Sequence, residues 1–290
     1  MALSDMQVFN QYLMEAVAET LPQQVEKFNG ASNGAIVLTS MDFEGDYFER
    51  SFYSALHSAQ RRVDRYAANN AQSSTALAQL KEASVKVAGG FGPILFEPAQ
   101  MTWIRKNTAE AIAVMSQQLS EAMMADQLNS AIAALVAAIS NQAAATNDVS
   151  GSAGISYTAI NNAHAKFGDS SMSLIAQVMN GTAYHKLIGQ NLANTPQLFQ
   201  AQNVMVVDIL GKPVIVTDAP ALYEAGLPNK LKVLSLAASA ATVMDGSEVV
   251  SNIETSNGKE RIESTMQADY SFGLGLKGYT WDTTNGGKSP

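Results

Sequence analysis

Three glycines near the end of the chain have the spacing of a dinucleotide-binding fingerprint. Gly273, Gly275 and Gly278 match the pattern G-x-G-x-x-G, in which glycines let the backbone approach a pyrophosphate at the start of a helix. That chemistry needs a strand before the glycines and a helix after them. Here the glycines lie inside a strand pattern, and only 12 residues follow Gly278. We therefore predict that this motif binds no dinucleotide.

Nucleophilic and metal-binding residues are few and scattered along the sequence. The chain has no cysteine, which excludes disulfides, thiolate nucleophiles and iron–sulfur sites. Its histidines, His57, His164 and His185, form no zinc-binding pair, and we expect each at the surface or at a helix end. Asp208 and Asp218 flank a predicted strand pair and could meet in space, although carboxylates at strand ends are ordinarily solvated. With no P-loop and no nucleophile elbow, the sequence predicts no catalytic, cofactor or metal site and no enzyme.

Basic side chains offer electrostatic contacts in the first third of the chain. Arg61, Arg62 and Arg65 follow an aromatic stretch, and Lys81 and Lys86 follow a polar one. Runs of charge are most often a solvated face, and that interpretation stays open. The alternative for the three arginines is an intersubunit or inner-surface electrostatic contact. In the intersubunit case, we expect all five side chains to meet carboxylates of an adjacent subunit.

Composition limits the partners of such a chain. The formal net charge of the 290 residues is -8. Tight binding to nucleic acid requires clustered Lys and Arg that neutralise phosphates, so any contact with DNA should be weak and local. Charged residues make up 15% of the sequence, against about 25% in average soluble domains. Much polar, uncharged surface is therefore expected to be covered by other subunits.

No secretory signal or membrane span is expected. The N-terminus lacks the basic region and the apolar stretch of a signal peptide. Residues 127–147 carry no charge, but polar side chains such as Asn129 and Gln142 interrupt them, and a bilayer span tolerates these poorly.

A long helix and a long strand are expected to form the framework that positions any residues in contact with other subunits. Apolar residues recur at three- and four-residue steps over residues 104–139, which predicts a helix that opens at Pro98, ends near Asn141 and measures roughly 60 Å. Apolar and polar residues alternate over 262–276, which predicts a strand of roughly 50 Å, with a bulge or bend at Gly278. We expect the helix to lie along the apolar face of the sheet in an elongated body.

The remaining segments predict an arm, a loop and a compact unit. Residues 3–28 have a loose helical stripe that Pro22 breaks, and polar residues bounded by glycines over 67–92 indicate an extended, mobile loop that reaches another chain. Residues 155–245 predict the compact unit. Its elements are helices at 157–167, with Ser156 as N-cap, and at 182–190, opened by Thr182, and strands at 174–179, 204–210, 214–217, 233–236 and 241–244.

This order of elements resembles the major capsid proteins of tailed double-stranded DNA bacteriophages, which have the HK97-like fold. Four phrases in the same order carry the likeness, which covers nearly the whole chain. They are LAQLKEASVKV (77–87), VMNGTAYHKL (178–187), LGKPVIVTDAP (210–220) and YSFGLGLKGYTW (270–281).

The resemblance implies an α+β fold with a long spine helix, an extended loop, and peripheral and axial domains. The implied parts are an N-terminal arm (1–34), the extended loop region with its flanking strands (35–95), a peripheral domain with the spine helix (96–150), an axial domain (151–245), and the returning long strand of the peripheral domain (246–290). Because the arm starts at Met1, a separate scaffold protein, or none, is expected rather than an N-terminal scaffolding segment.

The resemblance also implies a structural function. Such a protein assembles with itself, as pentamers and hexamers, into an icosahedral shell around phage double-stranded DNA. Scaffold, portal and decoration proteins would be further partners, with assembly in the host cytoplasm and a final location in the virion capsid.

Two other assemblies remain open at this point. An encapsulin-type nanocompartment shell shares the fold class but packages an enzyme instead of DNA. A flagellin-like filament protein also tends to be rich in Ala, Ser and Asn without Cys, but it should have long helices at both termini, and the ending here is rich in strand. An ordinary hydrolase is a weaker option that would require a pocket with convergent polar groups.

Overall fold

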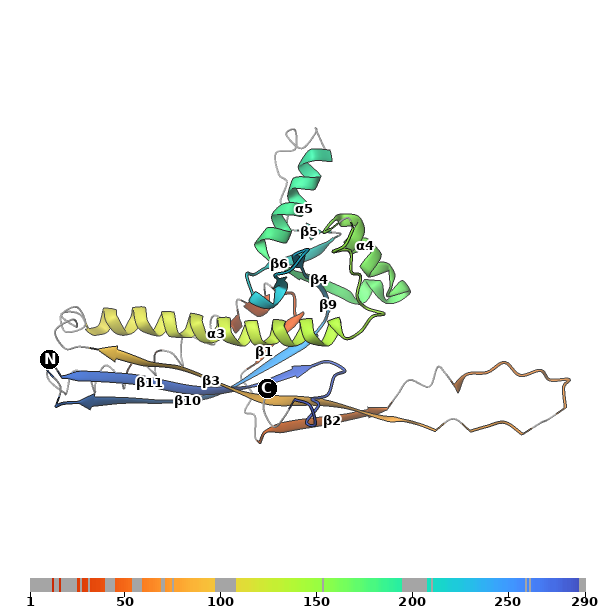
Figure 1. Ribbon diagram of the computed structural model, residues 1–290. Coiled ribbons are helices and arrows are strands. Elements are labelled where there is room, and N and C mark those ends of the chain that lie inside the picture. The colour runs from red at the N-terminus through yellow and green to blue at the C-terminus, as the bar shows by residue number, and fades with distance from the viewer. Residues whose placement is uncertain are drawn as a thin grey trace.

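A long layer of sheet and helix and a smaller unit above it make up the structure (Figure 1). The computed structural model describes residues 12, 16, 25–26, 28–30, 32–39, 45–53, 59–68, 71–74, 76–96, 108–152, 154–194, 208–209, 211–258, 260 and 262–286. The long layer is the elongated body that the two long elements of the sequence predict.

Five strands from both ends of the chain form the sheet of the long layer. Their spatial order is β1 (Ile36–Thr39), β10 (Ala241–Ser256), β11 (Glu263–Leu276), β3 (Gln79–Phe96) and β2 (Tyr47–Tyr53). Strand β1 pairs with β10 in parallel, and the other pairings are antiparallel. Residues more than 150 positions apart in sequence therefore lie side by side, for example Val85 and Leu274.

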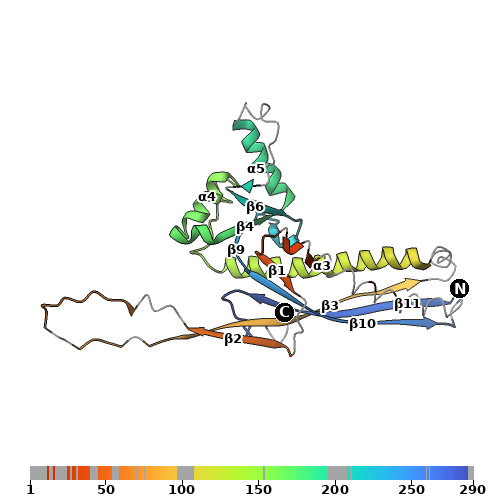
Figure 2. The ribbon, with the colours of Figure 1, turned by 180° about the vertical axis from the view of Figure 1, so that it is seen from behind.

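The apolar face of β11 packs against the long helix, as its alternation predicts. Met266, Ala268, Tyr270 and Phe272 are all buried, and helix α3 (Thr108–Ser140) runs along this face of the sheet (Figures 1 and 2). The helix ends within one residue of its predicted end, whereas the predicted start at Pro98 lies outside the described residues.

A partly buried hydrogen bond ties the helix to the sheet. The hydroxyl of Tyr270 donates to Oδ2 of Asp126 on α3 at 2.7 Å. Burial, together with this bond to a carboxylate, raises the pKa of Tyr270 well above its usual value. The phenol therefore keeps its proton and remains a donor to Asp126.

The glycines at the predicted end of the mobile loop belong instead to strand β3. A Cβ on Gly89 would lie 2.6 Å from the ring of Tyr270, so the absence of a side chain there lets the ring lie over the strand. Gly92 has a φ of 98°, and a Cβ there would lie 2.6 Å from the carbonyl oxygen of Met266. The prediction that the loop extends to residue 92 is therefore wrong, because residues from Gln79 onward pair with β11 or β2.

The last long strand ends before the position at which a bulge or bend was expected. Gly273 and Gly275 lie within β11, and Gly278 adopts a φ of 81° in the turn after the strand. Residues 277–286, the described part of the chain after β11, form no helix. The irregularity of this strand pair lies in β10, where the register shifts between Asp245 and Val249. Beyond that shift β10 continues to Ser256, a strand segment that the sequence patterns did not predict.

The smaller unit contains a second sheet flanked by helices. Its strand order is β5 (Asp208–Ile209), β6 (Lys212–Val216), β4 (Leu174–Met179) and β9 (Val233–Ala237). The helices are α4 (Tyr157–Ala165) and α5 (Gly181–Asn194), with the short 3-10 helices η2 (Gly168–Ser173) and η4 (Pro220–Leu222) and the two-stranded β7 (Tyr223–Glu224) and β8 (Lys230–Leu231).

Most elements of this smaller unit follow the sequence patterns. Strand β4 has its predicted bounds, and Ser156 caps α4 by accepting a hydrogen bond from the amide of Ala159 at 3.1 Å. Helix α5 begins one residue before Thr182, and Asn180 supplies the capping oxygen, at 2.9 Å from the amide of Ala183. Residues 241–244, expected in this unit, instead begin β10 of the long sheet.

His164 lies in the last turn of α4, in keeping with the expected helix-end position, but it is buried and not at the surface. Its side chain is 7% exposed, and its Nε2 lies 2.8 Å from the hydroxyl of Ser235. Burial lowers the pKa of His164 below its usual value, and the nearby positive charge of Lys212 lowers it further.

One hydrophobic core joins the two parts of the molecule. Helix α3 lies between the long sheet and the smaller unit (Figure 2). Ile132 and Leu135 of the helix share a cluster with Phe272 of β11 and Leu236 of β9. The smaller unit is therefore anchored to the long layer through the second half of α3.

The stretch Ala113–Ser140 of α3 is long and apolar enough to cross a bilayer by length and composition. The core helices of soluble proteins pass the same test. In this structure one face of the helix packs on the sheet, and Asp126 is held there by Tyr270.

Candidate intersubunit contacts

The loop between β2 and β3 carries the three arginines that the sequence singles out. It projects beyond the end of the long sheet (Figure 1), and all of its described residues from 59 to 78 are exposed, including Arg61, Arg62 and Arg65. The amide of Tyr66 donates to Oδ1 of Asp64 at 2.9 Å, which turns the chain within the loop. Large apolar side chains also face solvent there: Val63 is 65% exposed, Tyr66 is 95% exposed and Leu77 is 53% exposed.

The two lysines of the candidate set lie in the sheet and not on the loop. Lys81 on β3 pairs with Glu49 on β2 at 3.0 Å, with both side chains more than half exposed. An exposed pair of this kind contributes about 0–1 kcal/mol. Lys86 is half-buried opposite Gly273, and its amide donates to the carbonyl of Asp46 at 3.0 Å. The structure thus separates the candidate set into loop arginines and sheet lysines.

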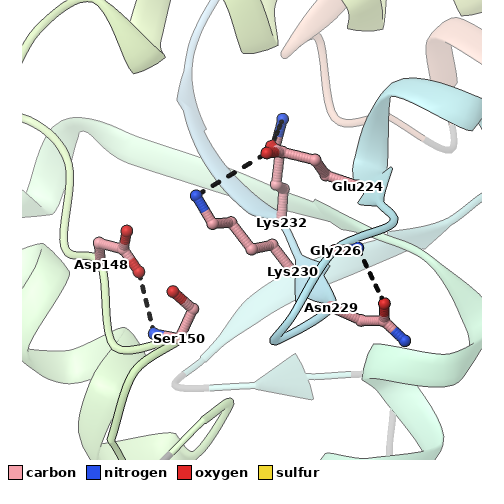
Figure 3. A network of polar contacts seen from close by, with 7 residues as sticks. All are labelled: Asp148, Ser150, Glu224, Gly226, Asn229, Lys230 and Lys232. Carbon is pink, nitrogen blue, oxygen red and sulfur yellow. Dashed lines mark hydrogen bonds and ion pairs between the residues drawn. The ribbon is translucent and has the colours of Figure 1, made fainter.

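The sequence patterns did not predict a polar network on the smaller unit. The carboxylate of Glu224 on β7 lies 3.0 Å from Nζ of Lys232 and 3.8 Å from Nζ of Lys230 (Figure 3). The hydrogen bond from Lys232 and the charge of Lys230 lower the pKa of Glu224. Asp148, from the segment after α3, accepts from the amide of Ser150 at 2.9 Å and lies in the same view. The network clamps the base of the β7–β8 hairpin.

The turn between β7 and β8 presents an apolar side chain to solvent. The amide of Gly226 donates to Oδ1 of Asn229 at 3.0 Å, which closes the turn (Figure 3). Leu227 between them is fully exposed. Met172 in η2 is 88% exposed. Only packing geometry could have identified these positions, because single leucines and methionines carry no signal in the sequence.

An open groove on the smaller unit is a candidate binding pocket. It has a volume of about 770 Å³ and lies between the start of α5 and the β7–β8 hairpin. Asp218 lines it and accepts from the amide of Gly181 at 3.3 Å, so this carboxylate caps the helix. Within the described ranges, no group of three or more His, Asp or Glu side chains could hold a metal ion.

The chain matches one family model almost from end to end. Residues 5–290 match the family described as Major capsid protein 13-like, or Gp13-like. The chain belongs to this family of major capsid proteins. No curated protein matches this major capsid protein.

Solved phage structures share its fold at low sequence identity. A chain from Microbacterium phage Oxtober96 has a TM-score of 0.52 at 12% identity, covering 85% of this chain and 84% of that one. A chain from Mycobacterium phage Ogopogo has a TM-score of 0.51 at 13% identity, with 86% and 87% covered. A chain of the Cyanophage Pam1 capsid asymmetric unit has a TM-score of 0.50 at 11% identity, with 81% and 83% covered.

These matches establish the fold and the structural role of the major capsid protein. It has the HK97-like α+β fold that the four sequence phrases suggest, and it is a structural protein of an icosahedral phage capsid. An encapsulin-type shell and a flagellin-like filament are not favoured. Membership in a capsid family also points to a structural role instead of a catalytic one.

Proposed function

We propose that this major capsid protein assembles as pentamers and hexamers into a shell around double-stranded DNA, and that its loop arginines hold neighbouring subunits together. The observation that supports the proposal is the loop itself. Its described residues include Val63 and Tyr66 beside Arg61, Arg62 and Arg65, and the chain leaves all of them exposed. An isolated protein gains nothing from exposing an aromatic side chain among cations, whereas a subunit can bury both in an interface.

The proposed division of the chain follows the two layers. The long layer would be the peripheral domain with α3 as its spine, and the smaller unit would be the axial domain near the centre of each pentamer or hexamer. The expected boundary between residues 245 and 246 falls inside β10. In the proposal, therefore, β10 belongs to the peripheral domain from its start at Ala241.

Contact with DNA in the proposed shell is weak. The chain carries a net charge of -8, so its overall field repels phosphates, and only local basic groups can approach them. Weak contact suits a container that must release its genome. Scaffold, portal and decoration proteins are further proposed partners, the host cytoplasm is the proposed site of assembly, and neither an enzymatic activity nor a membrane partner is proposed.

Electron microscopy of the purified protein, alone and after expression with other phage proteins, tests the proposal. Closed particles of uniform size, with pentamers at the five-fold vertices and hexamers between them, are expected. Straight filaments would contradict it in favour of a flagellin-like assembly, and particles that hold an enzyme and no DNA would favour a nanocompartment.

Charge reversal tests the role of the loop. Arg61→Glu combined with Arg62→Glu is expected to impair formation of particles while the unassembled protein stays folded, because both side chains are exposed. Lys81→Glu provides a comparison within the sheet, since Lys81 already has a partner, Glu49, in its own chain. Normal assembly of the double arginine variant would overturn the role given to the loop.

A further inference from the structure

Five asparagines in the chain are followed directly by glycine, and such a pair of residues is chemically labile. They are Asn29, Asn33, Asn180, Asn257 and Asn285. In each pair the backbone nitrogen of the glycine can attack Cγ of the asparagine, because glycine has no side chain to hinder the approach. The attack needs a glycine amide without another partner, an asparagine side chain that is unbound, and a backbone that can rotate. The structure distinguishes the five pairs by these three requirements.

Hydrogen bonds to the reacting groups hold two of the pairs. Nδ2 of Asn29 donates to the carbonyl of Leu38 at 2.7 Å, and Oδ1 of Asn29 accepts from the amide of the same residue at 2.9 Å. Oδ1 of Asn180 accepts the hydrogen bond that caps α5. The amide of Gly181, which would be the nucleophile of that pair, donates to Oδ1 of Asp218 at 3.3 Å. Neither pair therefore meets the requirements.

The pair near the end of the chain is held around Asp282. Nδ2 of Asn285 donates to Oδ2 of Asp282 at 2.7 Å. The amide of Gly286, the nucleophile of this pair, donates to the carbonyl of Asp282 at 2.8 Å. Both reacting groups are therefore occupied.

The pair at Asn33 is exposed but fixed in a turn. Asn33 has a φ of 52°. The amide of Ala35 donates to the carbonyl of Ser32 at 3.1 Å, and the carbonyl of Gly34 accepts from the amide of Ser239 at 2.8 Å. These bonds fix the peptide planes on both sides of the pair, so the nitrogen of Gly34 cannot rotate toward Cγ of Asn33. This pair is therefore a natural control for exposure without freedom of the backbone.

Asn257 meets all three requirements. It follows Ser256, the last residue of β10, in the turn that leads to β11, and its side chain is exposed. Neither its side-chain amide nor the amide of Gly258 forms a hydrogen bond with the described part of the chain. Gly258 has a φ of 95°, and nothing beyond its chain neighbours lies within 4 Å of the position where a Cβ would stand. The space in which a five-membered ring would close is therefore open.

We propose that Asn257 is a site of spontaneous deamidation. The backbone nitrogen of Gly258 forms a bond to Cγ of Asn257 and gives up its proton. The bond between Cγ and the side-chain nitrogen breaks, and this nitrogen takes the proton and leaves as ammonia. Water then opens the resulting succinimide at either of its carbonyl groups, which gives aspartate or isoaspartate at this position. The reaction consumes one water and needs no oxidant, metal or enzyme.

The modification changes the charge and the backbone of the turn between β10 and β11. Each conversion replaces a neutral amide with a carboxylate, so the net charge of -8 becomes more negative by one unit for each chain converted. The isoaspartate product also carries the main chain through the side chain of residue 257, which adds a methylene group to the turn. Copies of the chain that are identical when made therefore become different with age, a property that goes beyond the proposed function.

Isotope labelling of the full-length protein tests the proposal. Incubation in heavy-oxygen water at mildly alkaline pH adds a heavy oxygen to each asparagine that passes through the succinimide. Mass spectrometry of the digested protein, with fragmentation to locate the label, should find a labelled fraction at Asn257 at least severalfold above that at Asn33. The other Asn-Gly pairs should resemble Asn33.

The same incubation in urea is the matched control. Unfolding frees all five glycine amides, so all five asparagines should take up the label at comparable rates. Selective labelling of Asn257 in the folded protein, with labelling of all five in urea, is the expected result. A folded protein without label at Asn257 would overturn the proposal, and so would equal labelling of all five sites.

Isoelectric focusing gives a second, independent readout. The parent protein should develop a more acidic band during incubation, and Asn257→Gln should lose most of this band, because a longer side chain must close a six-membered ring. Asn33→Gly, which keeps the positive φ of the turn, should develop the band as the parent does. An equally strong band in Asn257→Gln would overturn the proposal. Circular dichroism checks that both variants fold, and neither readout depends on whether the protein forms particles.

Discussion

The inner face of the long sheet and the loop between β2 and β3 differ in how far the protein's own contacts bury their side chains. On the inner face, Phe272 is 1% exposed and Tyr270 is held by Asp126 at 2.7 Å. On the loop, Tyr66 is 95% exposed and Arg61 is exposed. The same chain thus contains a part that its own contacts stabilise and a part whose side chains remain to be covered. The difference indicates where the fold ends and where assembly begins.

Removing the largest side chain from the inner face should have the largest effect on the fold. Phe272 lies in the core shared by α3 and both parts of the molecule, and its ring stacks with that of Tyr270 at 6.4 Å. Phe272→Ala is expected to lower the free energy of unfolding by about 3–5 kcal/mol, because it loses buried area and leaves a cavity. Urea denaturation of the unassembled protein measures this loss.

The fully exposed Leu227 supplies the control for that measurement. Leu227→Ala should change the free energy of unfolding by no more than about 0.5 kcal/mol, as is usual for surface positions. Equal effects of the two substitutions would mean that the long layer does not stabilise itself, and the contrast between core and loop would then disappear.

A smaller loss of stability is expected from adding a side chain at Gly92, where strand β3 has no room for one. Gly92→Ala forces a non-glycine residue to a φ of 98° and places Cβ 2.6 Å from the carbonyl oxygen of Met266. The backbone strain alone costs about 1–3 kcal/mol, and the close contact adds to it. The shift of the denaturation midpoint measures the sum.

A substitution at Gly258 distinguishes backbone strain from the close Cβ contact as the cause of the destabilisation. The φ of Gly258 is 95°, but nothing lies within 4 Å of the position where a Cβ would stand. Gly258→Ala should therefore show the strain without the contact and be less destabilising than Gly92→Ala. A larger loss at Gly258 would contradict the view that β3 must be bare at Gly92 to pair with β11.

Acidification should weaken the packed part of the molecule through His164. Burial holds the folded-state pKa of this side chain below its usual value of 6.5, so the unfolded chain binds the proton more readily. The stabilisation is complete above about pH 6.5 and declines as the pH falls toward the folded-state pKa. The melting temperature should therefore fall from neutral pH to about pH 5.5, and His164→Gln should reduce this slope. An unchanged slope in the variant would assign the acid sensitivity to other groups.

Hydrophobic periodicity predicted the helices and strands that keep the same burial pattern along their whole length. Helix α3 and strand β11 were predicted because each keeps one apolar face over its length, and β4 because it is buried on both sides. The second half of β10 was missed because the register shift between Asp245 and Val249 breaks its alternation. Strand β3 was partly mistaken for loop, because Gly89 and Gly92 resemble turn residues until the ring and the carbonyl that lie against them are known.

The candidate contacts divide in the same way. Arg61, Arg62 and Arg65 could be found in the sequence because they are close together in it. Lys81 has the same charge as the arginines, but its pairing with Glu49 across two strands was invisible without the register.

Of these substitutions, one at the exposed Tyr66 of the loop is expected to change stability least. It also distinguishes most directly between a side chain that serves the fold and one that serves the interface. Tyr66 is 95% exposed and makes its contact with Asp64 through the backbone amide and not the ring. Tyr66→Ser should therefore change the free energy of unfolding of the unassembled protein by less than about 0.5 kcal/mol. The same substitution should reduce the yield of particles, because it removes the aromatic side chain proposed to be buried between subunits. Denaturation and electron microscopy of one preparation measure both quantities, and a variant that unfolds more easily but assembles normally would place Tyr66 in the fold instead of the interface.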